Sequence, residues 1–280
     1  MPNNTIQDIF RKYGPEYIKH HKLSKEQWKV YNAIMSCKTK ELGIHNIICK
    51  ECGEVITGFN SCRNRHCPMC QSYARECWIK NQSNYLLDCP YFHIVITVPS
   101  ELNEIALYNQ KEFYNILFKA TSESILELCN DPKWLGAKVG ITSILHTWGQ
   151  TMDFHPHIHS VVTGGGIKNN KWVESKKEYL LKVQVLSSLF KSKFLSMLKH
   201  LDLNLPNHLK HLKNLKELNN FLRPLYYKDW VTYIDPPKGS PVLVDILFGW
   251  LSLMKELKIY LTIKLLLNIK TIKIILKSKK

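Results

Sequence analysis

The sequence predicts an α+β protein in which helices cover one face of an antiparallel sheet and a small zinc-binding domain forms the amino-terminal part. Three observations predict it: cysteines gathered between Cys37 and Cys70, short β-branched runs in the middle of the chain, and longer segments with apolar residues at helical spacing, among them 179–222. We divide the 280 residues into a helical and zinc-binding domain (1–88), a sheet domain (89–241) and a divergent basic tail (242–280).

The composition fits a globular protein with an anionic partner. Hydrophobic content of 45% and charged content of 22% are ordinary, but 39 Lys and Arg against 23 Asp and Glu give a net charge of +16. Such an excess is typical of proteins that bind nucleic acid. We find no signal segment and no run of the ~18 apolar residues that a membrane span needs, so we expect a cytoplasmic protein without a membrane partner. In that reducing compartment, nine cysteines favour metal ligands over disulfides.

Residues 5 to 35 have helical spacing, and cysteines dominate the segment that follows. Two Cys-x-x-Cys pairs stand out, Cys49/Cys52 and Cys67/Cys70. Each pair can form one edge of a tetrahedron, so the two pairs predict a closed, structural Zn²⁺ site that supplies folding free energy to a core-poor segment. Four further residues could provide a second site or replace one ligand: Cys37, His45, Cys62 and His66.

Three arginines surround the second cysteine pair: Arg63, Arg65 and Arg75. We expect them to contact DNA phosphates from a zinc-held loop, with a solvated basic surface as the alternative.

The middle of the chain predicts a strand, a helix and two more strands. Residues 92–98 are β-branched and lie between prolines, and Ser100 is expected to cap a helix that reaches Leu128. Strands over 139–148 and 154–163 follow and predict an antiparallel pair. We interpret His93 and His146, in their apolar strands, as core or edge histidines.

The last of these strands carries His157 and His159 on one face, with Ile158 buried behind them. Two imidazoles on one face suit a divalent cation, although an isolated His-x-His also occurs by chance on edge strands. We expect Mg²⁺ or Mn²⁺ here, and because their coordination is octahedral, Gln150 is a candidate for a further ligand.

Four stretches together resemble the zinc-binding HUH transposases of rolling-circle insertion sequences: 61–71, 93–99, 146–159 and 164–166. The resemblance covers 15–241 and implies a transposase on the prokaryotic nucleoid that nicks one strand of single-stranded transposon ends. It also implies that His157 and His159 hold a metal that polarises the scissile phosphate. A tyrosine on a later helix then attacks and leaves a 5′-phosphotyrosine link.

That tyrosine is missing from its expected place. After the turn at 236–241 the family has tyrosine-leucine-x-arginine-tyrosine-threonine, whereas this chain reads Val242 to Trp250 without a tyrosine. Reading each codon from its third base permits arginine, tyrosine and threonine in succession from Val244. We therefore expect a frameshift near Pro241, which the gene's nucleotides can test, and an incomplete transposase without its nucleophile. The alternative is a non-catalytic, zinc-dependent DNA-binding remnant.

Overall fold

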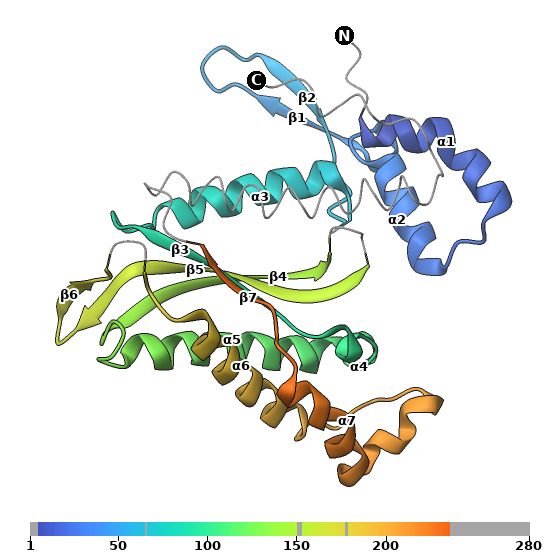
Figure 1. Ribbon diagram of the computed structural model, residues 1–280. Coiled ribbons are helices and arrows are strands. Elements are labelled where there is room, and N and C mark those ends of the chain that lie inside the picture. Colours follow the sequence, from blue (N-terminus) through green and yellow to red (C-terminus); the bar gives the residue numbers. More distant parts are fainter. Residues whose placement is uncertain (1–4, 65, 150–152, 177–178, 236–280) are drawn as a thin grey trace. The chain divides into compact units, whose positions relative to one another are not determined.

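The computed structural model describes residues 5–64, 66–149, 153–176 and 179–235 (Figure 1). They form two compact units, one within the residues up to Tyr85 and one that begins at Leu86. Arg65, Gln150 and the predicted tail over 242–280 lie outside the described residues. Within the described part of the chain, no helix is long and apolar enough to cross a membrane.

The first unit opens with two short helices that pack closely, α1 (Ile6–His20) and α2 (Lys25–Ser36). Each begins with a capping box, in which the side chain of Thr5 or Ser24 accepts a hydrogen bond from the third helical N–H. A Cβ atom at Gly14 would lie 2.7 Å from the ring of Tyr31, so the absence of a side chain there permits the close approach.

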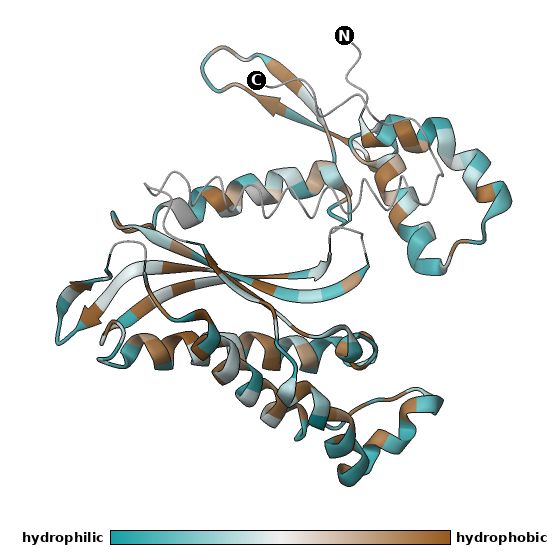
Figure 2. Ribbon diagram, in the orientation of Figure 1, coloured by the Kyte–Doolittle hydropathy of each residue, from teal (hydrophilic) through white to brown (hydrophobic). Residues whose placement is uncertain are grey.

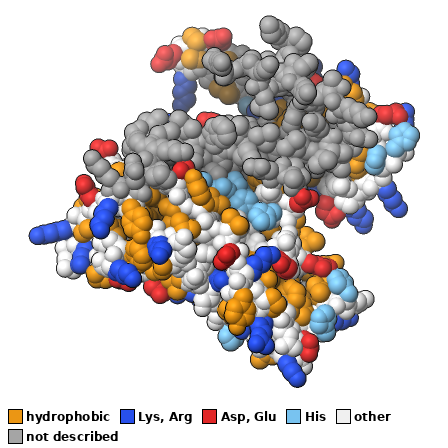
Figure 3. Space-filling model, viewed as in Figure 1, with side chains coloured by type: hydrophobic (Ala, Val, Ile, Leu, Met, Phe, Trp, Pro, Cys, Tyr) orange, Lys and Arg blue, Asp and Glu red, His pale blue; other side chains and the backbone are white. Residues whose placement is uncertain are grey.

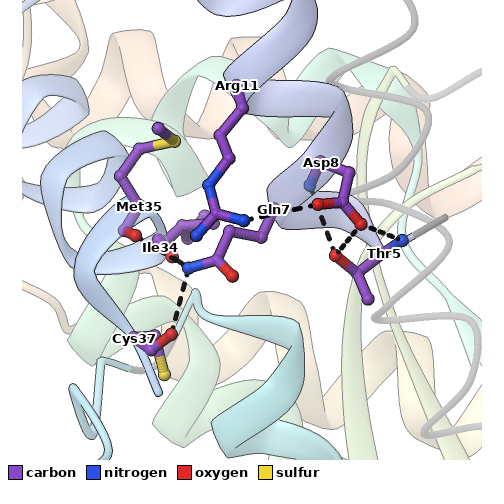
Figure 4. A network of polar contacts seen from close by, with 7 residues as sticks. All are labelled: Thr5, Gln7, Asp8, Arg11, Ile34, Met35 and Cys37. Atoms are coloured by element: carbon purple, nitrogen blue, oxygen red, sulfur yellow. Dashed lines mark hydrogen bonds and ion pairs between the residues drawn. The ribbon is translucent and has the colours of Figure 1, made fainter. Parts of the chain in front are cut away.

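Gln7 fixes the end of α2 against α1 (Figure 4). Its buried amide nitrogen donates to the carbonyl oxygens of Ile34, Met35 and Cys37, at 2.9, 2.7 and 3.0 Å. These carbonyls belong to the last turn and cap of the helix, where no intrahelical donor remains for them. The contact therefore holds Cys37, the C-cap residue of α2, in a defined place.

A hairpin and a third helix complete this unit. After a 3₁₀ turn, η1 (Lys40–Leu42), strand β1 (Ile44–Ile48) pairs antiparallel with β2 (Val55–Phe59). The pairing runs from Ile44 opposite Phe59 at the base to Ile48 opposite Val55 beside the turn. Helix α3 (Pro68–Ser83) follows.

The second unit is built on an antiparallel sheet with the strand order β4-β5-β3-β7. Its strands are β3 (Tyr91–Thr97), β4 (Lys138–Trp148), β5 (Phe154–Lys168) and β7 (Thr232–Asp235), and a short β6 (Lys171–Glu174) pairs with β5. The predicted α+β class is confirmed, and β5 is central between β3 and β4.

Helices cover one face of this sheet (Figure 1). Helices α5 (Gln110–Asn130) and α6 (Val183–Leu198) run along it, and the hydropathy colours of Figure 2 show apolar residues on strands and helices alike. Alternate residues of β3 and β5 pack into this core, as the burial of Phe92, Ile94 and Ile158 shows. The residues between them project from the opposite face.

The helices differ from their prediction at two places. The segment expected as one helix from Ser100 is a 3₁₀ turn, η2 (Ser100–Leu102), then α4 (Asn103–Tyr108) and α5. The break falls at buried Asn109, whose side chain donates to Ile105 O and Asn204 O and accepts from Asn204 N. The predicted helical region 179–222 is α6, η3 (Asn207–Lys213) and α7 (Leu215–Tyr227).

Candidate metal centres

Four cysteine thiols of the first unit converge on one point: Cys37, Cys62, Cys67 and Cys70. Their sulfurs lie within 4.8 Å of one another, and the Sγ of Cys70 is 3.5 Å from that of Cys37 and 3.6 Å from that of Cys62. A tetrahedral Zn²⁺ with ~2.3 Å bonds requires sulfurs about 3.8 Å apart. The donor set and its spacing therefore fit a structural zinc ion.

Each thiol is positioned by a different local structure. Cys37 is the C-cap residue of α2, Cys67 directly precedes α3, and Cys70 lies in the first turn of α3. Cys62 lies just before Arg63, whose φ of 53° turns the chain so that the Asn64 N–H lies 3.4 Å from the Cys62 sulfur. The Cys62 N–H in turn approaches the Cys37 sulfur at 3.5 Å. Backbone donors directed at sulfur favour the thiolate form that a metal requires.

Without a cation, the four thiols cannot all ionise. Burial raises the pKa of Cys62 to about 11 and also raises that of Cys67. Burial has the same tendency at Cys70, but hydrogen bonds from the neighbouring thiols outweigh it and lower the pKa of that residue. The positive charge of a bound ion would favour the thiolate form of all four sulfurs.

The structure differs from the predicted ligand set at Cys49 and Cys52. They lie exposed at the turn of the β1–β2 hairpin, and they do not join a group of three or more metal-binding side chains among the described residues. Five strand residues at ~3.3 Å each carry this turn roughly 15 Å from the hairpin base. Backbone N–H groups of Cys52 and Glu51 lower the pKa of Cys49, so the pair keeps the geometry of a half-site.

The predicted DNA-contact arginines are only partly described. Arg63 is exposed beside the four-cysteine group, Arg75 lies on α3, and Arg65 is outside the described residues. Contact with DNA phosphates stays a prediction for all three.

A second convergent group consists of imidazoles on the sheet face opposite α5 and α6: His146, His157 and His159. A patch of histidine side chains is visible on this unit (Figure 3). His146 of β4 lies opposite His157 of β5, and its ring centroid is 5.3 Å from that of His157 and 4.3 Å from that of His159. One ring nitrogen from each of the three lies within 4.8 Å of the others.

The tautomer of His157 is fixed by the backbone. Its Nδ1 is 2.8 Å from the carbonyl oxygen of His155, and because a carbonyl can only accept, Nδ1 carries the proton. The lone pair then lies on Nε2, the nitrogen that a metal would bind. The donor chemistry thus fits a divalent cation, and three imidazoles suit a first-row transition ion better than Mg²⁺.

The surroundings keep His157 and His159 neutral. Burial lowers the pKa of His157, and burial together with the neighbouring His146, His157 and His93 lowers the pKa of His159 to about 2. Neutral imidazole is the metal-binding form, so the site is ready to accept a cation at neutral pH.

This lowered pKa makes stability depend on pH. An unfolded chain protonates His159 near 6.5, whereas the folded chain resists protonation down to about 2. The stability that the neutral His159 imidazole contributes to the folded chain is fully present above pH 6.5, and it is lost progressively as the pH falls below that value. We expect the urea midpoint of the metal-free protein to fall between pH 7 and 5, and to fall less in His159→Gln, which cannot titrate. Equal pH dependence in the two proteins would contradict the assignment.

The third imidazole, that of His146, was not expected in this group. His146 is 3% exposed but belongs to the histidine group, although its apolar strand suggested a core or edge residue. His93 also faces this group, with its Nε2 2.9 Å from Nδ1 of His159. These residues come together only through the pairing register of the strands, which cannot be derived from the sequence alone. Gln150, the predicted further ligand, lies outside the described residues.

Comparisons with known proteins match both units. Residues 9–98 match a family described as "Transposase zinc-binding domain", and residues 140–244 match one described as "Putative transposase". Over 243 residues the chain is 42% identical to "Putative transposase y4qJ" of Sinorhizobium fredii, covering 84% of this chain and 61% of that protein. Over 136 residues it is 35% identical to the transposase for insertion sequence element IS801 of Pseudomonas savastanoi pv. phaseolicola, covering 48% and 32%.

The chain therefore spans less than two thirds of either relative. Among solved structures, TrwC complexed with a 27-mer DNA that comprises a recognition hairpin and cleavage site is similar with a TM-score of 0.33 and 11% identity. That match covers 64% of this chain and 74% of the TrwC chain. At this low structural similarity, the TrwC structure does not bear on either metal centre.

Proposed function

We propose that this chain is a zinc-binding transposase of insertion sequences and that its sheet unit is a DNA-nicking domain of the rolling-circle HUH type, which binds DNA but lacks the nucleophile for cutting. The observation that carries the proposal is the convergence of three imidazoles on the face of the sheet opposite α5 and α6, two of which burial keeps neutral. The relatives are transposases by description, and transposition requires breaking a DNA strand.

The chemistry follows from what a phosphodiester needs. A divalent cation held by the three imidazoles would neutralise charge on the scissile phosphate. His157 holds its lone pair toward that position because its other nitrogen is committed to a carbonyl. The proposed DNA is single-stranded transposon-end DNA, and Arg63, Arg65, Arg75 and the +16 net charge would supply contacts to its backbone.

The missing part is an aligned tyrosine. Tyr226 and Tyr227 lie on α7, in the helical layer, and a Lys199 ammonium lies 5.2 Å from the Tyr226 ring centroid. Tyr233 shares the histidine face through Val95, and its hydroxyl donates a hydrogen bond to Asp235 at 3.2 Å. The match to the transposase family ends at Val244, which supports the proposal that the sequence after Pro241 departs from the family through a frameshift.

A strand-transfer assay tests this function. The full chain is incubated with labelled single-stranded DNA containing an element end, in Mn²⁺ or Mg²⁺, and analysed under denaturing conditions. We expect a retarded DNA complex on native gels and no covalent adduct. A gene corrected by the shift near Pro241 should form the adduct, and His157→Ala in that corrected chain should abolish it.

Other results would replace the proposal. An adduct with the present chain refutes the loss of the nucleophile, and its disappearance in Tyr233→Phe would assign the reaction to β7. Cleavage without an adduct would point to hydrolysis by water. Absence of any DNA binding would refute the DNA-binding role itself.

A further inference from the structure

His93 stands next to the three-histidine group without belonging to it. It lies on β3, where Phe92, Ile94 and Ile96 point into the core, so His93 projects from the histidine face. In the antiparallel register Val95 is opposite His159, which makes His93 the diagonal neighbour of His159. Aromatic side chains can reach one another across such a diagonal.

The contact between the two rings is directional. Nε2 of His93 and Nδ1 of His159 are 2.9 Å apart, and the ring planes differ by only 10°. A ring N–H lies in the plane of its ring, so nearly parallel rings allow it to point at the lone pair of the other nitrogen. One of the two nitrogens must carry the proton and the other must accept it.

The metal site decides which nitrogen donates. Nδ1 of His159 is committed to His93, so Nε2 is the nitrogen left for the group with His146 and His157. Neutral imidazole has one N–H, and a lone pair on Nε2 therefore requires the proton on Nδ1.

His93 must then accept through Nε2 and carry its own proton on Nδ1. Asp235 of β7 is directly opposite His93 in the strand pairing, which places a carboxylate on the same face beside His93.

We propose that His93 is a positioning residue of the metal site, which holds His159 in the Nδ1–H tautomer by accepting its proton. The inference rests on the proposed function, since it assigns a role within the same site. A ligand histidine generally needs such a partner, because an imidazole that is free to rotate or change tautomer presents its lone pair only part of the time. His157 has the His155 carbonyl for this purpose, and His159 has His93.

Two substitutions separate the hydrogen bond from mere packing. His93→Gln keeps an acceptor near the position of Nε2, whereas His93→Leu fills space without one. We expect His93→Leu to weaken Mn²⁺ binding by about 10- to 100-fold and His93→Gln to bind close to wild type. Titration calorimetry or Mn²⁺ electron paramagnetic resonance measures this, with His211→Leu, an exposed site on the same unit, as the matched control.

A second measurement needs no metal. Long-range ¹H–¹⁵N spectra of the metal-free protein report the tautomer of His159, which should be Nδ1–H in wild type and His93→Gln and shift toward Nε2–H in His93→Leu. Equal losses of Mn²⁺ affinity in both variants, or an unchanged tautomer in His93→Leu, would overturn the positioning role. If wild type binds no Mn²⁺ but the tautomer responds as expected, the proposed metal function fails and the role of His93 toward His159 stands.

Discussion

Cys67→Ser should leave the first unit without zinc and unfolded, whereas Cys49→Ser/Cys52→Ser should leave the zinc in place. Cys67 is fully buried and belongs to the four-cysteine group, while the other pair is exposed at the hairpin turn. Structural zinc supplies an apparent ~10–16 kcal/mol in small domains, more than a unit with so small a core can replace. Zinc content by atomic emission and circular dichroism measure the two effects.

Cys77→Ser is the matched control, because Cys77 is an exposed cysteine on α3 outside the group. It should retain both the zinc and the fold. Complete zinc loss in the hairpin double variant as well as in Cys67→Ser would restore the ligand set predicted from the two Cys-x-x-Cys pairs. Partial loss in both would indicate that two ions are bound.

His157→Ala should lower Mn²⁺ affinity by more than about 100-fold, beyond the range seen when an outer partner of a metal ligand is removed. The substitution deletes one of three imidazole donors, and its position is on the face of β5 away from the core, so the fold should survive. Calorimetric titration measures the affinity and thermal unfolding checks the fold.

His155→Ala provides the comparison on the same strand. Its carbonyl oxygen, which fixes the tautomer of His157, remains after the side chain is removed. The variant should therefore bind Mn²⁺ nearly as wild type does. A loss as large as that of His157→Ala would show that the His155 ring takes part in the site.

The sequence predicted the elements whose evidence is local. β-Branched residues between prolines identified β3, and alternation along 154–163 identified β5 and placed His157 and His159 on one face with Ile158 behind them. The family prediction, drawn from the long motifs, is also confirmed.

The sequence could not predict which local structures meet. Spacing shows that Cys49 and Cys52 can form a knuckle, but it cannot show that the hairpin carries this knuckle away from Cys67. Cys37 and Cys62 lack a Cys-x-x-Cys partner, and they join the group through the end of α2 and a positive-φ turn. In the sheet, only the strand register shows that His93 and His146 lie beside His157 and His159.

Side chains alternate along β5, so the residues needed for folding and those of the metal site lie on opposite faces of the strand. Ile158 and Val162 contribute to folding, while His157 and His159, between and beside them in the sequence, contribute to chemistry on the other side. Damage to the reaction therefore carries little thermodynamic penalty, and a copy that loses activity still escapes the proteases that remove unfolded chains. Such a copy would persist at normal abundance after its activity is gone, because the side chains that fold β5 are untouched.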